Sequence, residues 1–214
     1  MEELSADFPE DARIDYQQIL GRFAADSIET LKSALADELP YIWLDAYRTM
    51  THRVTNVIRF SCDSFEYVFD DYASLEATDR VQPGSSMEAR LVAVSGTTIV
   101  KRAKRDDSRL KGWVGPTQAV YGTCWDKGHF IAHSIGGSVD RAEVNVFVQR
   151  RDLNRGWSAA GKRYVKMEKY CKLNPGTFCF SRPVYLDERA KPSFVEFGIL
   201  LNNSTFWVDC FDNR

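Results

Sequence analysis

The stretch from Trp125 to Gly156 constrains the fold of this chain more than any other part of the sequence. The apolar run at 144–149 has the length of one strand. Small residues and glycines at 134–138 come before it and are typical of a loop. The stretch ends at Gly156, and Gly161 follows just before a segment of helical composition begins. The pattern predicts a strand that ends at about His129, a loop at 134–138, a second strand at 144–149 and a helix at 162–172.

Three kinds of chemical group lie close together along this part of the chain. An imidazole such as that of His129 accepts a proton near neutral pH without special tuning, which suits a general base. The amide oxygen of Asn154 is hard and neutral, which suits a Mg²⁺ ion that keeps most of its waters. Guanidinium groups grip phosphate through paired hydrogen bonds. Three of them follow the second strand, at Arg150, Arg151 and Arg155. Together these groups are suited to cutting a phosphodiester with one cation.

The two ends of the stretch resemble the DNA/RNA non-specific endonuclease family of the ββα-metal, or His-Me finger, nucleases. The pattern of that family runs Asp-Arg-Gly-His, then Asn-x-x-x-Gln, then Leu-Asn-x-Gly, then Glu. The matching residues here are Asp126 to His129, Asn145 with Gln149, and Leu153 to Gly156. The resemblance covers residues 86–214 and implies an α+β fold with a ββα-metal core of antiparallel strands. It also implies an endonuclease that hydrolyses DNA, RNA or both with little sequence specificity, using Mg²⁺ or, in its place, Mn²⁺.

The resemblance further implies a role for each matched side chain. His129 would be the general base, Asn154 would hold the cation, and Asp126 would orient the strand or the histidine. Asn145 would brace the site together with Gln149. Simpler interpretations stay open, since Asn154 also fits a helix N-cap, Asn145 and Gln149 also fit solvent-facing strand positions, and each arginine also fits a surface salt bridge. The residues expected to bind substrate phosphates are Arg150, Arg151, Arg155 and Lys127.

The chain departs from the family pattern at two positions. Lys127 stands where the family usually has arginine, which keeps the charge but loses the two-pronged geometry. Glu168 is the first glutamate after Asn154 and follows it by fourteen residues, and an unbroken helix of that length would span about 21 Å. Either the glycines at 156 and 161 form a loop that folds a second helix back, or Glu168 does not help to hold the metal. The paired glycines favour the loop, so Glu168 is expected to be a catalytic and metal-holding residue.

Charge is unevenly distributed along the chain. The net charge of the whole is −2, yet residues 1–85 carry −10 and residues 86–170 carry +8. The positive surplus coincides with the matched stretch, where a polyanionic substrate would need it. Within it, residues 101–111 hold six cations and two anions, which fits either a solvated loop or a flap that faces phosphates.

The first part of the chain is expected to form a mainly helical, acidic accessory segment at residues 1–82. Apolar side chains at 14–35 recur at helical spacing, and Pro9 and Pro40 bracket them. A turn-rich break separates this segment from a nuclease domain at 86–214. The acidic segment could fold over the basic face, form a homodimer or bind a protein partner, as would suit a bacterial toxin or defence system.

Further strands are expected on both sides of the matched stretch. Residues 54–60 form one candidate, and residues 89–94 and 97–100 flank a candidate hairpin turn at Ser95 and Gly96. Near the end of the chain, two strands at 194–201 and 205–211 surround a clear hairpin signal of two asparagines and a serine.

Composition also bears on the location of the protein. No apolar run reaches transmembrane length, so no membrane association is expected, and the acidic N-terminus lacks the layout of a secretory signal. The five cysteines contain no C-x-x-C pair and are interpreted as mostly reduced thiols of a cytoplasmic protein. A disulfide between Cys171 and Cys179 stays open, as does export by a specialised secretion system.

Other functions compete with the nuclease hypothesis. A nuclease fold that has lost activity could serve as a nucleic-acid-binding or partner-binding module. His133 follows His129 at the spacing of a zinc pair, but further ligands are not evident. Cys124 with His129 could form a cysteine hydrolase, although five residues along a strand put them on opposite faces. Plasmid nicking with and without EDTA separates these functions.

Overall fold

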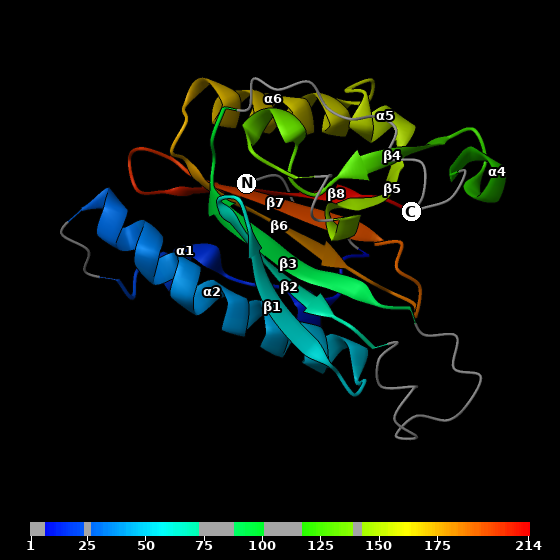
Figure 1. The fold of residues 1–214 in the computed structure, drawn as a ribbon, viewed down its shortest axis with the longest axis horizontal. Coiled ribbons are helices and arrows are strands. Elements are labelled where there is room, and N and C mark those ends of the chain that lie inside the picture. The colour runs from blue at the N-terminus through cyan, green and yellow to red at the C-terminus, as the bar shows by residue number, and fades with distance from the viewer. Residues whose placement is uncertain (1–6, 24–26, 73–87, 101–116, 139–142) are drawn as a thin grey trace.

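The computed structural model describes residues 7–23, 27–72, 88–100, 117–138 and 143–214. They form the α+β fold expected from the sequence, with helices on both faces of one antiparallel sheet (Figure 1). This sheet has six strands in the order β1-β2-β3-β6-β7-β8. They are β1 (Val57–Cys62), β2 (Phe65–Asp70), β3 (Arg90–Thr97), β6 (Phe178–Val184), β7 (Phe194–Leu200) and β8 (Phe206–Asp212).

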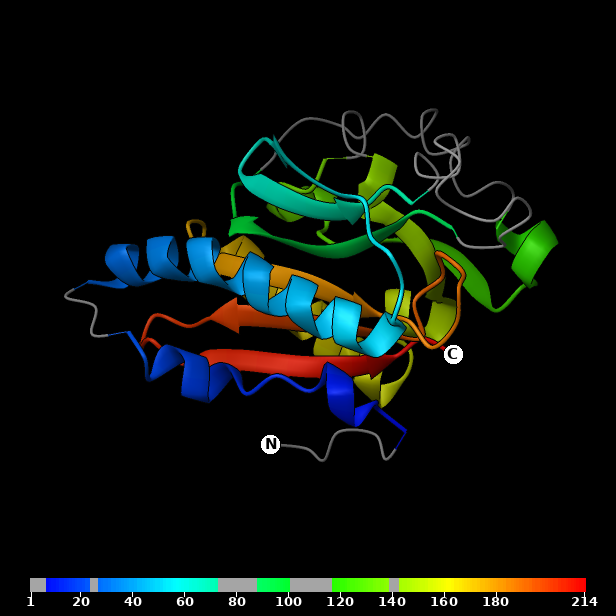
Figure 2. The same ribbon diagram turned by 90° about the horizontal axis from the view of Figure 1, so that it is seen from below.

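Helix α2 (Ile28–Thr51) lies along one face of the sheet, together with α1 (Tyr16–Leu20) and the 3₁₀ turn η1 (Glu10–Ala12) (Figure 2). Ser27 caps the start of α2, because its side chain accepts a hydrogen bond from the Thr30 N–H at 3.1 Å. The apolar spacing of α2 directs one stripe of side chains toward the sheet. The buried members of that stripe are Leu31, Leu35, Leu39, Trp43 and Tyr47.

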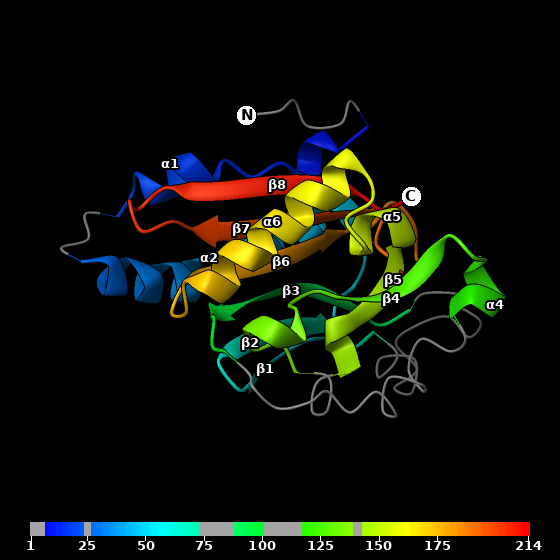
Figure 3. The same ribbon diagram turned by 90° about the horizontal axis from the view of Figure 1, so that it is seen from above.

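The opposite face of the sheet carries the stretch that the sequence singles out (Figure 3). Strands β4 (Trp125–His129) and β5 (Val146–Arg150) form a separate two-stranded antiparallel sheet. Helix α5 (Arg151–Asn154) follows β5 directly, and α6 (Ala159–Leu173) lies over the large sheet. The short helical segments around them are α4 (Thr117–Tyr121), η3 (His133–Ile135) and η4 (Glu143–Asn145).

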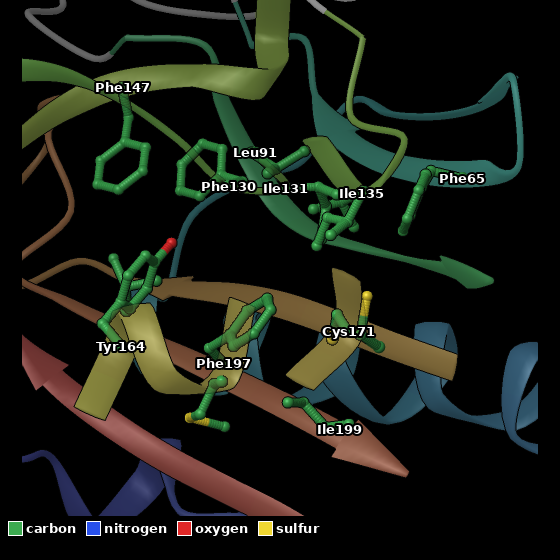
Figure 4. Packing of buried hydrophobic residues seen from close by; sticks show 14 of the residues in the cluster. Phe65, Leu91, Phe130, Ile131, Ile135, Phe147, Tyr164, Cys171, Phe197 and Ile199 are labelled. Carbon is green, nitrogen blue, oxygen red and sulfur yellow. The ribbon is translucent and has the colours of Figure 1, made fainter. Parts of the chain in front are cut away.

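A second core fills the space between these elements and the large sheet (Figure 4). The rings of Phe130 and Phe147 stack with their centroids 4.2 Å apart above the sheet. From α6, the ring of Tyr164 meets Phe197 of β7 at a centroid distance of 5.6 Å. Burying a large apolar side chain contributes about 1.5–3 kcal/mol, so this core fixes the hairpin and α6 on the sheet.

The expected end of the first helix at Pro40 is wrong, because α2 continues through Pro40 to Thr51. A proline inside a helix costs about 3 kcal/mol. Beyond it, however, Trp43 and Tyr47 are buried against the sheet, and their burial offsets that cost. The helix ends instead at His52, whose φ of 50° places it in the left-handed region.

The expected hairpin turn at Ser95 and Gly96 is also wrong, because β3 runs straight through both residues. A Cβ added to Gly96 would lie 2.1 Å from the carbonyl oxygen of Ser64, in the turn between β1 and β2. The glycine therefore marks a close approach of two backbones, which a sequence pattern does not distinguish from a turn. The hairpin near the end of the chain is confirmed as β7 and β8.

Residues before the expected domain boundary pack as part of the same sheet. Strands β1 and β2 form its edge beside β3, and α2 shares its core with Phe178 and Phe180 of β6. The described residues up to Asp70 therefore contribute α1, α2, β1 and β2 to the same sheet and core as the strands that follow. The expected boundary near 82–86 and the basic run at 101–111 lie outside the described residues.

The described part of the acidic segment does not cover the matched stretch. Helix α2 lies on one face of the large sheet, and β4, β5, α5 and α6 lie on the other (Figure 1). Within the described ranges, none of the helices combines the length and the hydrophobicity that a membrane-spanning segment needs.

Candidate active site

Strand β4 ends in His129 and pairs with β5 along its whole length. Helix α5 begins where β5 ends, and the Arg151 N–H donates to the carbonyl of Cys124 at 2.8 Å. This bond ties the first residue of the helix to the start of the hairpin. A hairpin followed by a helix therefore brings the Asn154 amide back beside the strand that carries the imidazole.

The carboxylate of Asp126 is the centre of the contacts between β4 and α5. It accepts hydrogen bonds from Arg155 Nε at 2.7 Å, Arg151 Nε at 3.0 Å and Asn154 Nδ2 at 3.4 Å. Burial alone would raise the pKa of Asp126, but the hydrogen bonds from α5 outweigh it and hold that pKa below its ordinary value. One negative charge thus orients two positive groups and an amide.

The helix N-cap interpretation of Asn154 is wrong. Asn154 is the last residue of α5, whose N-cap position is Arg150. The next helix, α6, is capped by Ser158, whose side chain accepts from the Gly161 N–H at 3.0 Å. The amide of Asn154 is therefore not used to start a helix.

A break separates α5 from α6, as predicted, but it is shorter than the one that Gly156 and Gly161 were expected to bracket, because α6 begins at Ala159 and includes Gly161. Gly156 has a φ of 66°, a conformation that favours glycine. Gly161 packs so closely on α5 that a Cβ would lie 2.4 Å from the carbonyl oxygen of Asp152. Helix α6 thus folds back against α5, as the loop interpretation requires. Glu168 is half-buried on α6, and this burial disfavours the charged carboxylate and raises the pKa of Glu168 to about 7.

The hydroxyl of Tyr164 joins α6 to the end of β4. It donates to the backbone carbonyl of His129 at 3.2 Å. Burial, and the charge of Glu168 one turn along the helix, raise the pKa of Tyr164 well above its ordinary value, while an interaction with Gln149 lowers it. Gln149 crosses β4 at Gly128, where an added Cβ would lie 2.1 Å from the Gln149 Oε1. The small residue before His129 therefore makes room for a protein side chain.

The side chain of Asn145 braces the segment that follows His129. Its Oδ1 accepts from the Ile131 N–H at 3.0 Å, and its Nδ2 donates to the Ile131 carbonyl at 2.9 Å. Its backbone carbonyl also accepts from the Phe130 N–H at 2.9 Å. Both Asn145 and Gln149 are buried, so the solvent-facing interpretation of these residues is wrong.

The structure brings together only part of the expected phosphate-binding set. Arg151 and Arg155 share Asp126, whereas Arg150 reaches Asp152 through Nε at 3.1 Å and Nη2 at 2.9 Å. On β4, Lys127 and His129 are two residues apart and share one face of the strand, while Asp126 faces the other way. Asp126 therefore orients α5 rather than the imidazole.

Two residues that support this site were not evident from the sequence. Tyr164 stands four residues before Glu168, a spacing that puts both on one face of a helix, but a buried tyrosine is usually a core residue. Asn213 accepts from the Arg150 N–H at 2.8 Å and donates to the carbonyl of Val148 at 2.9 Å. No signal near Asn213 in the sequence points to β5, because the contact spans the chain.

The competing chemistries gain no support from this geometry. Across the described ranges, no three His, Cys, Asp or Glu side chains gather closely enough to hold a metal ion by themselves. His133 lies in η3 and not on an extension of β4. Cys124 is an exposed free thiol, and Cys171 and Cys179 are buried free thiols.

Known proteins resemble this chain only distantly. No protein-family model matches the chain, and no curated protein matches it. A solved structure described as the Sda1 nuclease with bound zinc ion is 19% identical, with 75% of each chain covered and a TM-score of 0.38. A second, described as an extracellular endonuclease, is 11% identical, covers 77% of this chain and 81% of its own, and has a TM-score of 0.35. Likenesses of this size do not assign a function to the chain.

Proposed function

We propose that this protein is a metal-dependent endonuclease that hydrolyses phosphodiester bonds of DNA, RNA or both. The observation that carries the proposal is the unit of β4, β5 and α5, in which Asp126 holds two arginines and an amide against the strand that ends in His129. Imidazole, guanidinium and amide groups serve proton transfer, phosphate binding and cation binding. Because none of these tasks reads a base edge, little sequence preference is expected.

His129 is the proposed general base. It would accept a proton from the water that attacks phosphorus, a role that contributes about 10²–10⁴-fold to the rate. Two contacts support its position through the backbone: the Tyr164 hydroxyl bonds the His129 carbonyl, and Asn145 bonds both polar groups of Ile131 two residues later. Both contacts fix the backbone at His129 and just after it, which limits the motion of the imidazole during the reaction.

Arg151 and Arg155 are the proposed phosphate-binding groups. Both are bonded to Asp126, which cancels one of the two positive charges and leaves a net charge of about +1 at the end of α5. Arg155 has 46% of its side chain exposed, so its outer edge is accessible to a substrate phosphate. Asp126 thus reduces the net positive charge of the two arginines but fixes the direction of both guanidinium groups.

The residues present fit a hard divalent cation. Nδ2 of Asn154 faces Asp126, so Oδ1 is the atom of that amide left for a cation. Glu168 has a pKa raised by burial, and a nearby cation would favour its ionised form. When bound, Mg²⁺ or Mn²⁺ would neutralise charge that develops on the phosphate and on the leaving oxygen.

Nicking of supercoiled plasmid by the purified full-length chain tests this function. We expect nicking with Mg²⁺, none with excess EDTA, and recovery when Mg²⁺ is restored. Nicking that EDTA leaves unchanged would contradict the metal dependence. Retention of the plasmid without any nicking, at any Mg²⁺ or Mn²⁺ concentration, would favour a nucleic-acid-binding module in place of an enzyme.

A further inference from the structure

The outer face of α6 carries a stripe of lysines that the proposed reaction does not use. Tyr164, Met167 and Cys171 turn toward the sheet and are buried. The opposite side of the helix is exposed and holds four lysines, which we call the α6 lysine face: Lys162, Lys166, Lys169 and Lys172. Spacings of four, three and three residues keep these lysines along one side of the helix.

No described acid neutralises the α6 lysine face. None of the four lysines forms an ion pair with an acidic side chain in the described parts of the chain, while the neighbouring Arg163 is bonded to Asp209 at 2.7 Å. Lys166 lies over the ring of Trp207, with Nζ 5.6 Å from the ring centroid. The start of α6 packs on α5, since a Cβ on Gly161 would lie 2.4 Å from the Asp152 carbonyl oxygen, and Tyr164 of the same helix donates to the His129 carbonyl at 3.2 Å. The face therefore borders the candidate site and adds positive charge to it.

The two layers of the molecule differ in the sign of their charge. The described exposed acids of α2 lie on the far side of the large sheet from α6 (Figure 1): Glu29, Asp37, Glu38 and Asp45. A molecule with acid on one layer and base on the other turns its basic layer toward a polyanion as it approaches. This placement explains how a chain with a net charge of −2 can present a basic surface.

We propose that the α6 lysine face binds the phosphate backbone of double-stranded nucleic acid beside the scissile bond. From Lys162 to Lys172 the helix rises about 15 Å, which matches about four phosphates of one strand. This inference rests on the proposed function, because it extends the substrate surface of the same site. Lysine acts here as a point charge and reads no sequence, in keeping with the low sequence preference.

Salt-dependent binding tests the proposal. A fluorescent 30-base-pair duplex is titrated with the full chain carrying His129→Ala, with and without Lys162→Gln, Lys166→Gln and Lys169→Gln together. Each lost phosphate contact lowers the slope of log Kd against log salt by about 0.9, so we expect the slope to fall by roughly 2–3 and the affinity at low salt to fall by about tenfold or more. The matched control replaces Arg13, Arg22 and Lys32 by Gln, which changes the net charge equally on the α1–α2 layer.

Equal slopes for the α6 variant and the control variant would overturn the proposal. Each single lysine variant should lower the slope by about 0.9, which keeps the test decisive if the triple variant is unstable. Loss of binding to phosphatidylserine vesicles with an unchanged duplex slope would assign the face to a lipid surface and overturn the proposal as well.

Turnover of bis(p-nitrophenyl) phosphate by the α6 variant with His129 intact should stay within about twofold of wild type, since that ester is too short to reach the α6 lysine face. If the wild-type chain cleaves neither ester nor duplex, the proposed function fails, while the slopes still decide this inference.

Discussion

At Asp126 a single carboxylate accepts hydrogen bonds from Arg151 and Asn154 of α5 and from Arg155, the residue that follows this helix. The sequence predicts that Asp126 matters but not which element it orients. Strand alternation places His129 on the other face of β4, so Asp126 orients the groups that we propose bind the cation and the phosphate, and not the imidazole. The imidazole is positioned separately, by backbone bonds from Tyr164 and Asn145.

Replacing Asn154 by alanine should raise the Mg²⁺ concentration needed for half-maximal cleavage by about tenfold or more, because a direct ligand is lost. The reaction rate is measured over a Mg²⁺ titration. Asn203→Ala, in the exposed turn between β7 and β8, is the matched control and should leave the titration unchanged. A titration of the Asn154 variant that superimposes on wild type would show that Asn154 holds no cation.

Replacing Tyr164 by phenylalanine should lower kcat by roughly tenfold with little change in KM, because the His129 carbonyl loses its partner while the ring keeps its packing. The lost hydrogen bond should lower the free energy of unfolding by about 0.5–1.5 kcal/mol. Tyr170→Phe, one and a half turns along α6, is the control and should retain both kcat and stability. A Tyr164 variant that loses stability but keeps kcat would make this tyrosine purely structural.

At the scale of elements, the loop between α5 and α6 decides whether Glu168 can serve the site. Alanine in place of a helical glycine normally stabilises a helix by about 1 kcal/mol. At Gly161 the added Cβ would meet the Asp152 carbonyl at 2.4 Å and the Leu153 carbonyl at 2.9 Å, so Gly161→Ala should destabilise the fold instead, by roughly 1–3 kcal/mol. Urea denaturation measures the change.

The matched control for Gly161→Ala is Gly21→Ala at the end of α1. Gly21 has a φ of −63°, and its added Cβ would approach no atom closer than 3.4 Å. This substitution should change the free energy of unfolding by no more than about 0.5 kcal/mol. If Gly161→Ala proved as harmless as the control, the close packing of α6 on α5 would be contradicted.

The sequence predicted the elements whose signals are local. The strand at 144–149, the helix at 162–172, a break after Gly156 and the last hairpin are confirmed, because periodicity and turn residues specify them directly. The continuation of α2 through Pro40 was not predictable, since it depends on packing against strands far away in the chain. For the same reason the sequence did not reveal that β1 and β2 join the large sheet.

The site shows the same division between local and distant signals. Spacing within one motif predicted Asp126 and Asn154 close together on a strand and a helix, and their side chains are in contact. The contact of Tyr164 with His129 joins residues 35 positions apart, and that of Asn213 with Val148 joins residues 65 positions apart. Both depend on how α6 and β8 pack, which no motif encodes.

At the scale of the whole molecule, the described residues between Asp7 and Asp70 share the sheet and core of the residues that follow, so we expect their removal to destabilise the fold. A chain that begins at Ser86 would lack α2, β1 and β2 and would expose the core that α2 covers. We expect it to show no cooperative thermal unfolding, because one face of the sheet stays in water. A soluble truncated chain that unfolds cooperatively and binds duplex more tightly than the full chain would instead support an acidic segment that restrains the site.

The central claim is that His129 acts as the general base of a metal-dependent cleavage. The most direct measurement is the rate of duplex cleavage at saturating Mg²⁺ by purified His129→Asn, beside His52→Asn at the end of α2 as the matched control. Loss of a general base predicts a rate about 10²–10⁴-fold below wild type for the His129 variant, with duplex affinity unchanged. The His52 variant should cleave at the wild-type rate. Cleavage by the His129 variant at more than about a tenth of the wild-type rate would contradict the claim.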